Sequence, residues 1–192
     1  MMPGPSQDNR RESGADSPIG PVRQAARSLP TQYCEGKKPD MPPSFPLPAA
    51  MVRALELARG AAEAGEVPVG AVVTRDGIII GEGENRNRRD NDPTAHAEIV
   101  AIRAAASRSG DFRLSGCDLY VTLEPCAMCA GAIAHARIGR LYYGAPDPKG
   151  GGVEHGARVF SQPQCHHRPE LYGGLGEAEA AALLTGFFSA RR

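Results

Sequence analysis

The chain has 192 residues, which is enough for one compact domain and an additional segment. Lysine plus arginine and aspartate plus glutamate both number 22, so the formal net charge is zero. That balance excludes a protein that coats nucleic acid nonspecifically, because such binding needs a large basic excess. The five cysteines argue against a disulfide framework, and no apolar run suits a signal peptide or a membrane span, so we expect a cytoplasmic protein with no membrane contact.

The first 48 residues differ in composition from the rest of the chain, because they hold ten of the 17 prolines. Such a segment cannot bury enough apolar area to offset its ordering entropy, so we expect a disordered Pro-rich extension over 1–48 and a folded domain over 49–192. The extension is interpreted as an RNA-contacting arm, as an inert tail, or as the product of a start assigned too early, before Met41 or Met51. Acidic residues nearly cancel the basic ones there, which favours the second and third interpretations.

Helices and strands alternate after residue 48. Apolar residues at helical spacing predict a helix over 49–64, and Gly65 is a suitable C-terminal cap. Two strands over 69–74 and 78–83 are joined by a tight turn at Asp76-Gly77. The following predicted elements are a helix over 97–108, a strand over 118–123, a helix over 126–137, a strand over 140–145 and an amphipathic helix over 177–192. This alternation predicts a three-layer α/β domain with a mixed sheet.

Two short segments, TAHAEI (94–99) and EPCAMC (124–129), carry the residues suited to chemistry. Cys126 and Cys129 lie three residues apart on a predicted first helical turn, so both thiolates face one point. The dipole of that helix start favours their deprotonated, metal-binding form. His96 adds a third ligand from the start of another helix. Three protein ligands leave one tetrahedral position open, as in catalytic zinc sites.

Glu98 stands two residues after His96, where a carboxylate can move protons beside a zinc site. The pattern His-x-Glu with Pro-Cys-x-x-Cys is the general signature of zinc deaminases. The alternative is a structural metal knuckle, which needs a fourth ligand, and Cys117 is the nearest candidate. Glu98 would have no task in such a closed site, so the pattern favours catalysis.

From about residue 49 to its end, the chain resembles the bacterial tRNA-specific adenosine deaminases of the cytidine-deaminase-like superfamily. The stretches that carry the resemblance are EVPVGAVV (66–73), DPTAHAEI (92–99), LYVTLEPCAMCAGAI (119–133) and GAPDPKGG (144–151). The resemblance implies a three-layer α/β/α cytidine-deaminase-like domain with a mixed sheet of about five strands. It also implies one Zn²⁺ per subunit, a homodimer, and the tRNA anticodon stem-loop as partner.

The same resemblance implies an activity: hydrolytic deamination of adenosine to inosine at the wobble position of the tRNA anticodon, through zinc-activated water. In it Glu98 is the catalytic proton carrier, and Asn85 hydrogen-bonds the target nucleotide unless it serves its own turn. Asp147 and Lys149 contact the RNA backbone, where a carboxylate accepts a hydrogen bond from a ribose 2′-OH that DNA lacks. Pro146 and Pro148 on either side of Asp147 depart from the family pattern and stiffen the loop.

Two other functions remain open at the level of sequence. A free-base or nucleotide deaminase acting on guanine or cytosine shares the zinc motif, and a zinc-stabilised RNA-binding module would lack turnover. Phe187 and Phe188 are core residues or a wall of the base pocket. Cys165, His166 and His167 are adjacent, which disfavours a second metal site. Five arginines form either a phosphate-binding patch or ordinary surface charges; they are Arg86, Arg88, Arg89, Arg137 and Arg140.

Overall fold

The computed structural model describes residues 46–191. Over this range the chain forms, in order, α1 (Ala49–Glu63), β1 (Gly70–Arg75), β2 (Ile78–Glu84), α2 (Ala97–Ser109), β3 (Asp118–Leu123), α3 (Ala127–Ala136), β4 (Arg140–Ala145), the short 3-10 helix η1 (Val159–Ser161), β5 (Glu170–Tyr172) and α4 (Glu177–Ser189). The expected disordered extension over 1–48 lies outside the described residues except for its last three.

The five strands form one mixed sheet in the order β2-β1-β3-β4-β5. β1 pairs antiparallel with both β2 and β3, whereas β3, β4 and β5 run parallel to one another. The turn between β1 and β2 has positive φ at both Asp76 (52°) and Gly77 (77°), as a tight hairpin turn requires. The predicted hairpin is therefore confirmed.

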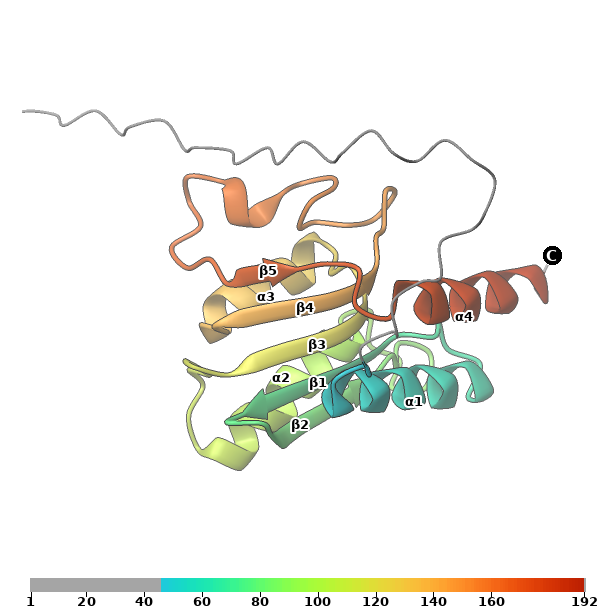
Figure 1. The fold of residues 1–192 in the computed structure, drawn as a ribbon, viewed down its shortest axis with the longest axis horizontal. Helices are drawn as coiled ribbons and strands as arrows, with labels where there is room; N and C mark the ends of the chain where they lie inside the picture. Colours follow the sequence, from blue (N-terminus) through green and yellow to red (C-terminus); the bar gives the residue numbers. More distant parts are fainter. Residues whose placement is uncertain (1–45, 192) are drawn as a thin grey trace, which may run out of the picture. The chain divides into compact units, whose positions relative to one another are not determined.

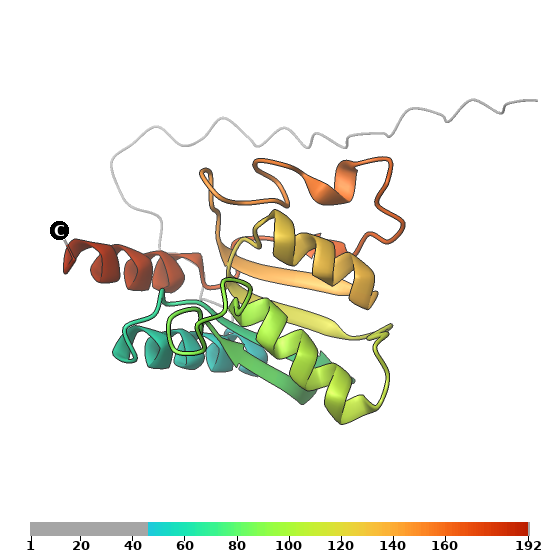
Figure 2. The same ribbon diagram turned by 180° about the vertical axis from the view of Figure 1, so that it is seen from behind.

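Helices cover both faces of this sheet and produce three layers. On one face α1 packs on β1 and α4 packs on β4 (Figure 1). On the other face α2 lies against β2 and β1, with α3 beside it (Figure 2). Each face has its own apolar core: Leu119, Val121 and Leu141 belong to the α2/α3 side, and Val72 and Met51 to the α1/α4 side. The expected α/β/α architecture is confirmed.

The approach of α2 to the sheet depends on two glycines of β2. A Cβ atom at Gly81 or at Gly83 would collide with the α2 backbone, at the carbonyls of Ala101 and Ala97 respectively. Glycine at both positions lets the helix lie close to the strand. This close packing fixes the start of α2, from which two functional side chains project.

Two short elements were not individually predicted. β5 follows Pro169, is three residues long and is exposed throughout, so no apolar alternation marks it as a strand. η1 lies in the long connection between β4 and β5 and buries Phe160. Among residues 46–191, no helix has both the length and the apolar character needed to cross a bilayer.

Candidate metal and active site

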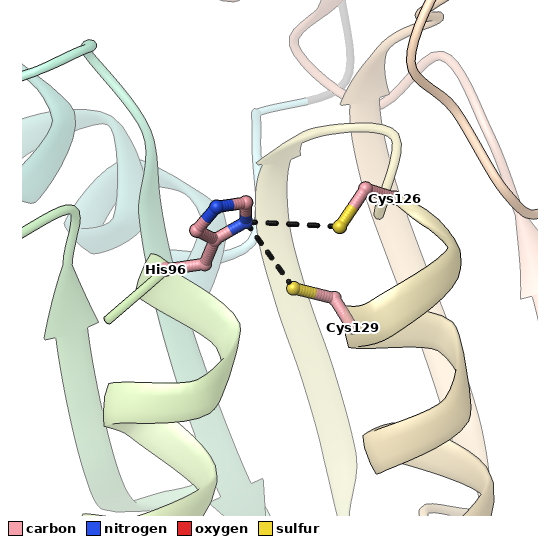
Figure 3. Close-up of side chains that lie close together, drawn as sticks. All are labelled: His96, Cys126 and Cys129. Carbon is pink, nitrogen blue, oxygen red and sulfur yellow. Dashed lines mark hydrogen bonds between the residues drawn. The ribbon is translucent and has the colours of Figure 1, made fainter. Parts of the chain in front are cut away.

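The predicted metal ligands come from the starts of the two neighbouring helices α2 and α3. His96 and Cys126 are the N-cap residues of α2 and α3, and Cys129 lies in the first turn of α3. Their three side chains point toward one another (Figure 3). The ligand atoms all lie within 4.8 Å of one another. His96 is 30 positions from Cys126 and 33 from Cys129 in the sequence, and the structure brings the three side chains together.

The distances within this group fit a tetrahedral zinc ion. His96 Nδ1 lies 3.7 Å from Cys126 Sγ and 3.5 Å from Cys129 Sγ. Zinc bonds of about 2.1 Å to nitrogen and 2.3 Å to sulfur at tetrahedral angles separate these atoms by about 3.6 Å. Within residues 46–191, no fourth His, Cys, Asp or Glu joins the group. Cys117 is buried in the apolar core instead, which argues against a closed structural site.

The protein itself favours a thiolate in this group. The pKa of Cys126 is lowered to about 4, first because the Cys129 side chain hydrogen-bonds its sulfur. Burial raises this pKa, but a second hydrogen bond, from His96, lowers it further. The pKa of Cys129 is raised, first by the contact with Cys126 and then by burial and by the charge of Glu98. A thiolate at Cys126 is the form that binds Zn²⁺, so the donor set fits this metal.

Glu98 lies in the first turn of α2 and is almost completely buried, with 4% of its surface exposed. Burial is the largest cause that raises the pKa of this carboxyl group above its ordinary value. A carboxyl group with a raised pKa holds and returns a proton more readily near neutral pH, which general acid–base catalysis requires.

A cleft of about 300 Å³ opens beside these groups. Its lining includes the metal ligands His96 and Cys126, the acid Glu98, and residues of two loops. The loop after β2 is the first wall, or Asn85 wall, and the loop after β4 is the second wall, or Asp147 wall. The remaining lining residues are Val67, Val69, Asn85, Asn87, Leu123, Glu124, Asp147 and Gly150. The predicted residues Asn85 and Asp147 therefore reach the same cavity as the metal ligands.

Asn85 forms part of the first wall and also caps α2. It is buried, and its Oδ1 accepts a hydrogen bond from the backbone N–H of Ala97 at 2.9 Å. This bond satisfies one of the free N–H groups of the helix start from a loop distant in sequence. Among the described residues, the Asn85 Nδ2 group makes no hydrogen bond, so this donor is available to a ligand in the cleft.

Asp147 and Lys149 belong to the second wall. Asp147 Oδ1 accepts hydrogen bonds from the backbone N–H groups of Lys149 at 3.1 Å and Gly150 at 2.9 Å. The carboxylate therefore shapes its own turn, a structural role beyond the RNA contact expected of it. The sequence Asp-Pro-Lys-Gly is the signal for such a turn, with Asp first, Pro second and Gly fourth.

A second hollow of about 560 Å³ adjoins the cleft and shares Val67, Leu123 and Asp147 with it. Lys149 lines this hollow, as do three residues of the C-terminal part of the chain, Leu184, Phe188 and Arg191. Phe188 is 51% exposed, whereas Phe187 is buried in contact with the Arg191 guanidinium. Phe187 is therefore a core residue, whereas Phe188 lines the adjoining hollow and not the base cleft itself.

Other sequence candidates lie outside this cleft. Cys165 Sγ donates a hydrogen bond to the backbone carbonyl of His167. The ring nitrogen Nε2 of His167 contacts the backbone carbonyl of Ile138, so both side chains are bound to the backbone. Most arginines of the suggested phosphate patch are paired within the protein. Their partners are Asp90 for Arg86, Glu84 for Arg89, Asp118 for Arg140 and the His166 carbonyl for Arg137.

Comparison with known proteins identifies the class of this site. Residues 47–145, more than half of the chain, match the family model of the cytidine and deoxycytidylate deaminase zinc-binding region. The matched range contains the three metal ligands and Glu98. The three possible metal ligands and the buried carboxyl group, at two helix starts of an α/β/α domain, carry the His-x-Glu and Pro-Cys-x-x-Cys signature of zinc-dependent deaminases.

Individual relatives narrow the class further. The tRNA-specific adenosine deaminase of Agrobacterium fabrum is 59% identical over 74% of this chain and 93% of its own length. A solved structure from a study of A-to-I editing by tRNA:A34 deaminases is 60% identical, with a TM-score of 0.70 over 70% of this chain and 98% of its own. Guanine deaminase from Nitrosomonas europaea is 26% identical, with a TM-score of 0.62 over 80% of this chain and 94% of its own.

The chain therefore belongs to the cytidine and deoxycytidylate deaminase family and, within it, to the tRNA-specific adenosine deaminases. It is an enzyme that depends on one Zn²⁺, for which His96, Cys126 and Cys129 form the fitting site.

Proposed function

We infer that this chain hydrolyses adenosine to inosine in tRNA, at the wobble position of the anticodon. The observation that carries this conclusion is the 59% identity to a tRNA-specific adenosine deaminase over 93% of that protein. The chain's tRNA substrate also supports a cytoplasmic location, which we propose with it.

We propose that each site residue takes one role in the reaction. His96, Cys126 and Cys129 would hold the ion; Zn²⁺, when bound, supplies a Lewis acid that activates water at neutral pH. Glu98 takes one proton from the attacking water and delivers it to the purine ring nitrogen; it then takes the second proton from the hydroxyl group added to the purine carbon and delivers it to the amine, which leaves as ammonia. The Asn85 Nδ2 group donates a hydrogen bond to the flipped nucleotide. Burial of Glu98 excludes bulk water from these transfers.

The second wall is proposed to contact the polynucleotide. Asp147 lies between the cleft and the adjoining hollow, so a base in the first and a neighbouring nucleotide in the second would both pass it. Phe188 offers an exposed ring for stacking, and Lys149 and Arg191 offer positive charge to phosphate. A free base needs only the smaller cleft, so the second hollow supports a polymer as substrate.

We also propose the homodimer and the domain division expected from the sequence. The solvent side of α3 carries Ala127, Met128 and Ala132 with no charged residue between them, which suits burial against a second subunit. Light scattering of the purified protein tests this state.

We propose that 49–192 is the deaminase domain; a chain starting at Ser44 with unchanged activity would support that division.

One assay tests the function. An anticodon stem-loop RNA with adenosine at the wobble position is incubated with zinc-loaded protein, and inosine is measured beside ammonia release from free guanine, cytosine and adenine. We expect inosine in the RNA and no ammonia from the free bases. Ammonia from guanine without inosine in RNA would establish the free-base alternative. Neither product from a protein that retains zinc and binds the RNA would establish the non-catalytic module.

A further inference from the structure

A second buried carboxylate, distinct from Glu98, lies at the end of β3. Glu124 is 2% exposed, precedes Pro125 and Cys126, and has no part in the metal group. Both of its oxygens accept hydrogen bonds from one later segment of the chain. Oε1 accepts the backbone N–H groups of Val153, Glu154 and His155 at 3.2, 2.9 and 3.0 Å. Oε2 accepts the backbone N–H group of Asp147 at 3.0 Å.

The imidazole of His155 completes this arrangement. Its Nδ1 lies 2.7 Å from Glu124 Oε2, and because a carboxylate only accepts, Nδ1 carries the donated proton. The ring is 37% exposed, so it covers the carboxylate on the solvent side. Burial raises the pKa of Glu124, but the backbone amides of Asp147, His155 and Glu154 and the His155 ring outweigh it and lower the pKa to about 2. The carboxylate is therefore charged near neutral pH.

One carboxylate thus holds both ends of the segment 147–155. Between those ends, the N–H of Gly151 donates to the Asp147 carbonyl at 2.9 Å and that of Gly152 to the Pro125 carbonyl at 2.8 Å. A Cβ atom at Gly151 would lie 2.6 Å from the carboxylate of Glu124, so the segment lies directly against it. The segment includes Asp147 and Gly150, which line the base cleft.

We propose that Glu124 and His155 are positioning residues that fix the Asp147 wall of the cleft in the conformation that receives the RNA. This inference rests on the proposed function and names how the same site holds its substrate. Neither residue touches the reacting atoms. Fixing the wall before the RNA arrives removes the cost of ordering it during binding, so the pair contributes to affinity and leaves the chemical step unchanged.

His155 offers the cleaner test, because its side chain makes one hydrogen bond and is partly exposed. His155→Ala removes the donor, whereas His155→Asn places an amide N–H near the position of Nδ1. We expect His155→Ala to raise KM for the anticodon stem-loop roughly ten-fold with kcat within about two-fold of the parent, because a hydrogen bond to a charged group is lost. We expect His155→Asn to recover most of that affinity.

His166→Ala is the matched control. This histidine is exposed and its side chain makes no hydrogen bond among residues 46–191, so both kinetic constants should stay at the parental values. A His155→Ala enzyme with parental KM, or with reduced kcat and unchanged KM, would overturn the proposal. So would a His155→Asn enzyme as impaired as His155→Ala.

Hydrogen exchange of the zinc-loaded protein separates this proposal from the proposed function, because it needs no substrate. We expect the amides of Asp147 and of 153–155 to exchange at least about ten-fold faster in His155→Ala, while peptides of α1 keep their parental rates. Unchanged protection of that segment would refute the positioning role, even in an enzyme that makes inosine. Faster exchange in a protein that makes no inosine would leave the segment anchored as described and refute the tRNA function alone.

Discussion

Each of the two walls of the base cleft is held by a buried glutamate, but the two glutamates accept different numbers of hydrogen bonds. The Asn85 wall is held by Glu66, which is buried and accepts the backbone N–H groups of Arg88 and Arg89 on Oε1 at 3.0 and 2.8 Å. The Asp147 wall is held by Glu124, which accepts four amides and one imidazole. Each wall therefore depends on a buried carboxylate that has no part in the chemistry.

The walls also differ in which metal-bearing helix they join. Asn85 bonds the first amide of α2, directly after His96. Glu124 stands two residues before Cys126, and the backbones of Gly151 and Cys126 form an isolated antiparallel β-bridge. Each wall is thus connected to the helix that supplies one side of the metal group. The substrate cleft and the metal site are therefore built as one unit, joined at two helix starts.

Metal removal should loosen both walls at once, because α2 and α3 lose the ion that their residues would hold in common. After chelation we expect inosine formation to fall by at least about 10³-fold and the thermal unfolding midpoint to drop. Hydrogen exchange should quicken in both walls together. Restoration of Zn²⁺ to one equivalent should reverse all three changes. Full activity in protein shown to be free of metal would contradict this account.

Replacing each of the two anchoring glutamates, Glu124 and Glu66, should show that they contribute unequally to the free energy of unfolding. We expect Glu124→Gln to lower the free energy of unfolding by about 3 kcal/mol at neutral pH, because the pKa of Glu124 is shifted from 4.5 to about 2 and each unit corresponds to about 1.4 kcal/mol. Glu66→Gln, with two hydrogen bonds at stake, should cost about 1 kcal/mol. Equal losses would remove the distinction between the walls.

The pH dependence of the Glu124 contribution has a defined sign. A folded pKa below the unfolded value stabilises the protein above pH 4.5, and this stabilisation disappears as the pH falls toward 2. The difference in unfolding free energy between the parent and Glu124→Gln should therefore narrow over that range. Denaturant titrations of both proteins at several pH values measure it, and a difference that widens on acidification would contradict the assignment.

The sequence predicted the chemical groups of the site better than the walls that surround them. His96, Glu98, Cys126 and Cys129 are recognisable because their spacing at helix starts is local and their residue types are those that bind zinc and move protons. The helices and the first four strands also follow from local periodicity, to within one or two residues at most ends.

The anchors were missed because their partners are distant and mostly backbone. Glu124 meets amides 23 to 31 residues later, and Glu66 meets amides 22 and 23 residues later. Every residue except proline has a backbone N–H group, so the residue types in the sequence do not predict these contacts. The available signal was indirect: a glutamate that follows an apolar strand directly, together with the glycine run 150–152, of which Gly151 lies against that glutamate.

The Asn85 wall should contribute to turnover through one side chain. We expect Asn85→Ala to lower kcat/KM for the stem-loop about 10- to 100-fold, since both the contact to the nucleotide and the hydrogen bond to α2 are lost. Asn85→Asp retains the acceptor for Ala97 but loses the Nδ2 donor. If the donor matters as proposed, both variants will be impaired; if Asn85→Asp is as active as the parent, Asn85 only caps the helix.

The smallest expected effect concerns the choice between RNA and DNA at the Asp147 wall. Asp147→Asn keeps the Oδ1 acceptor that holds Lys149 and Gly150, and changes only the second oxygen. We expect the preference for RNA to fall several-fold, because a carboxylate oxygen that accepts from a ribose 2′-OH is lost. Rates on matched RNA and DNA hairpins give the ratio, and an unchanged ratio would show that Asp147 serves its turn alone.

The central claim is that Glu98 moves the protons beside a zinc ion held by His96, Cys126 and Cys129. Its most direct test is Glu98→Gln, measured for bound zinc and for inosine in the anticodon stem-loop. The account predicts one equivalent of zinc, as in the parent, and a rate of inosine formation lower by about 10²- to 10⁴-fold. Zinc retained with inosine formed at the parental rate would contradict it.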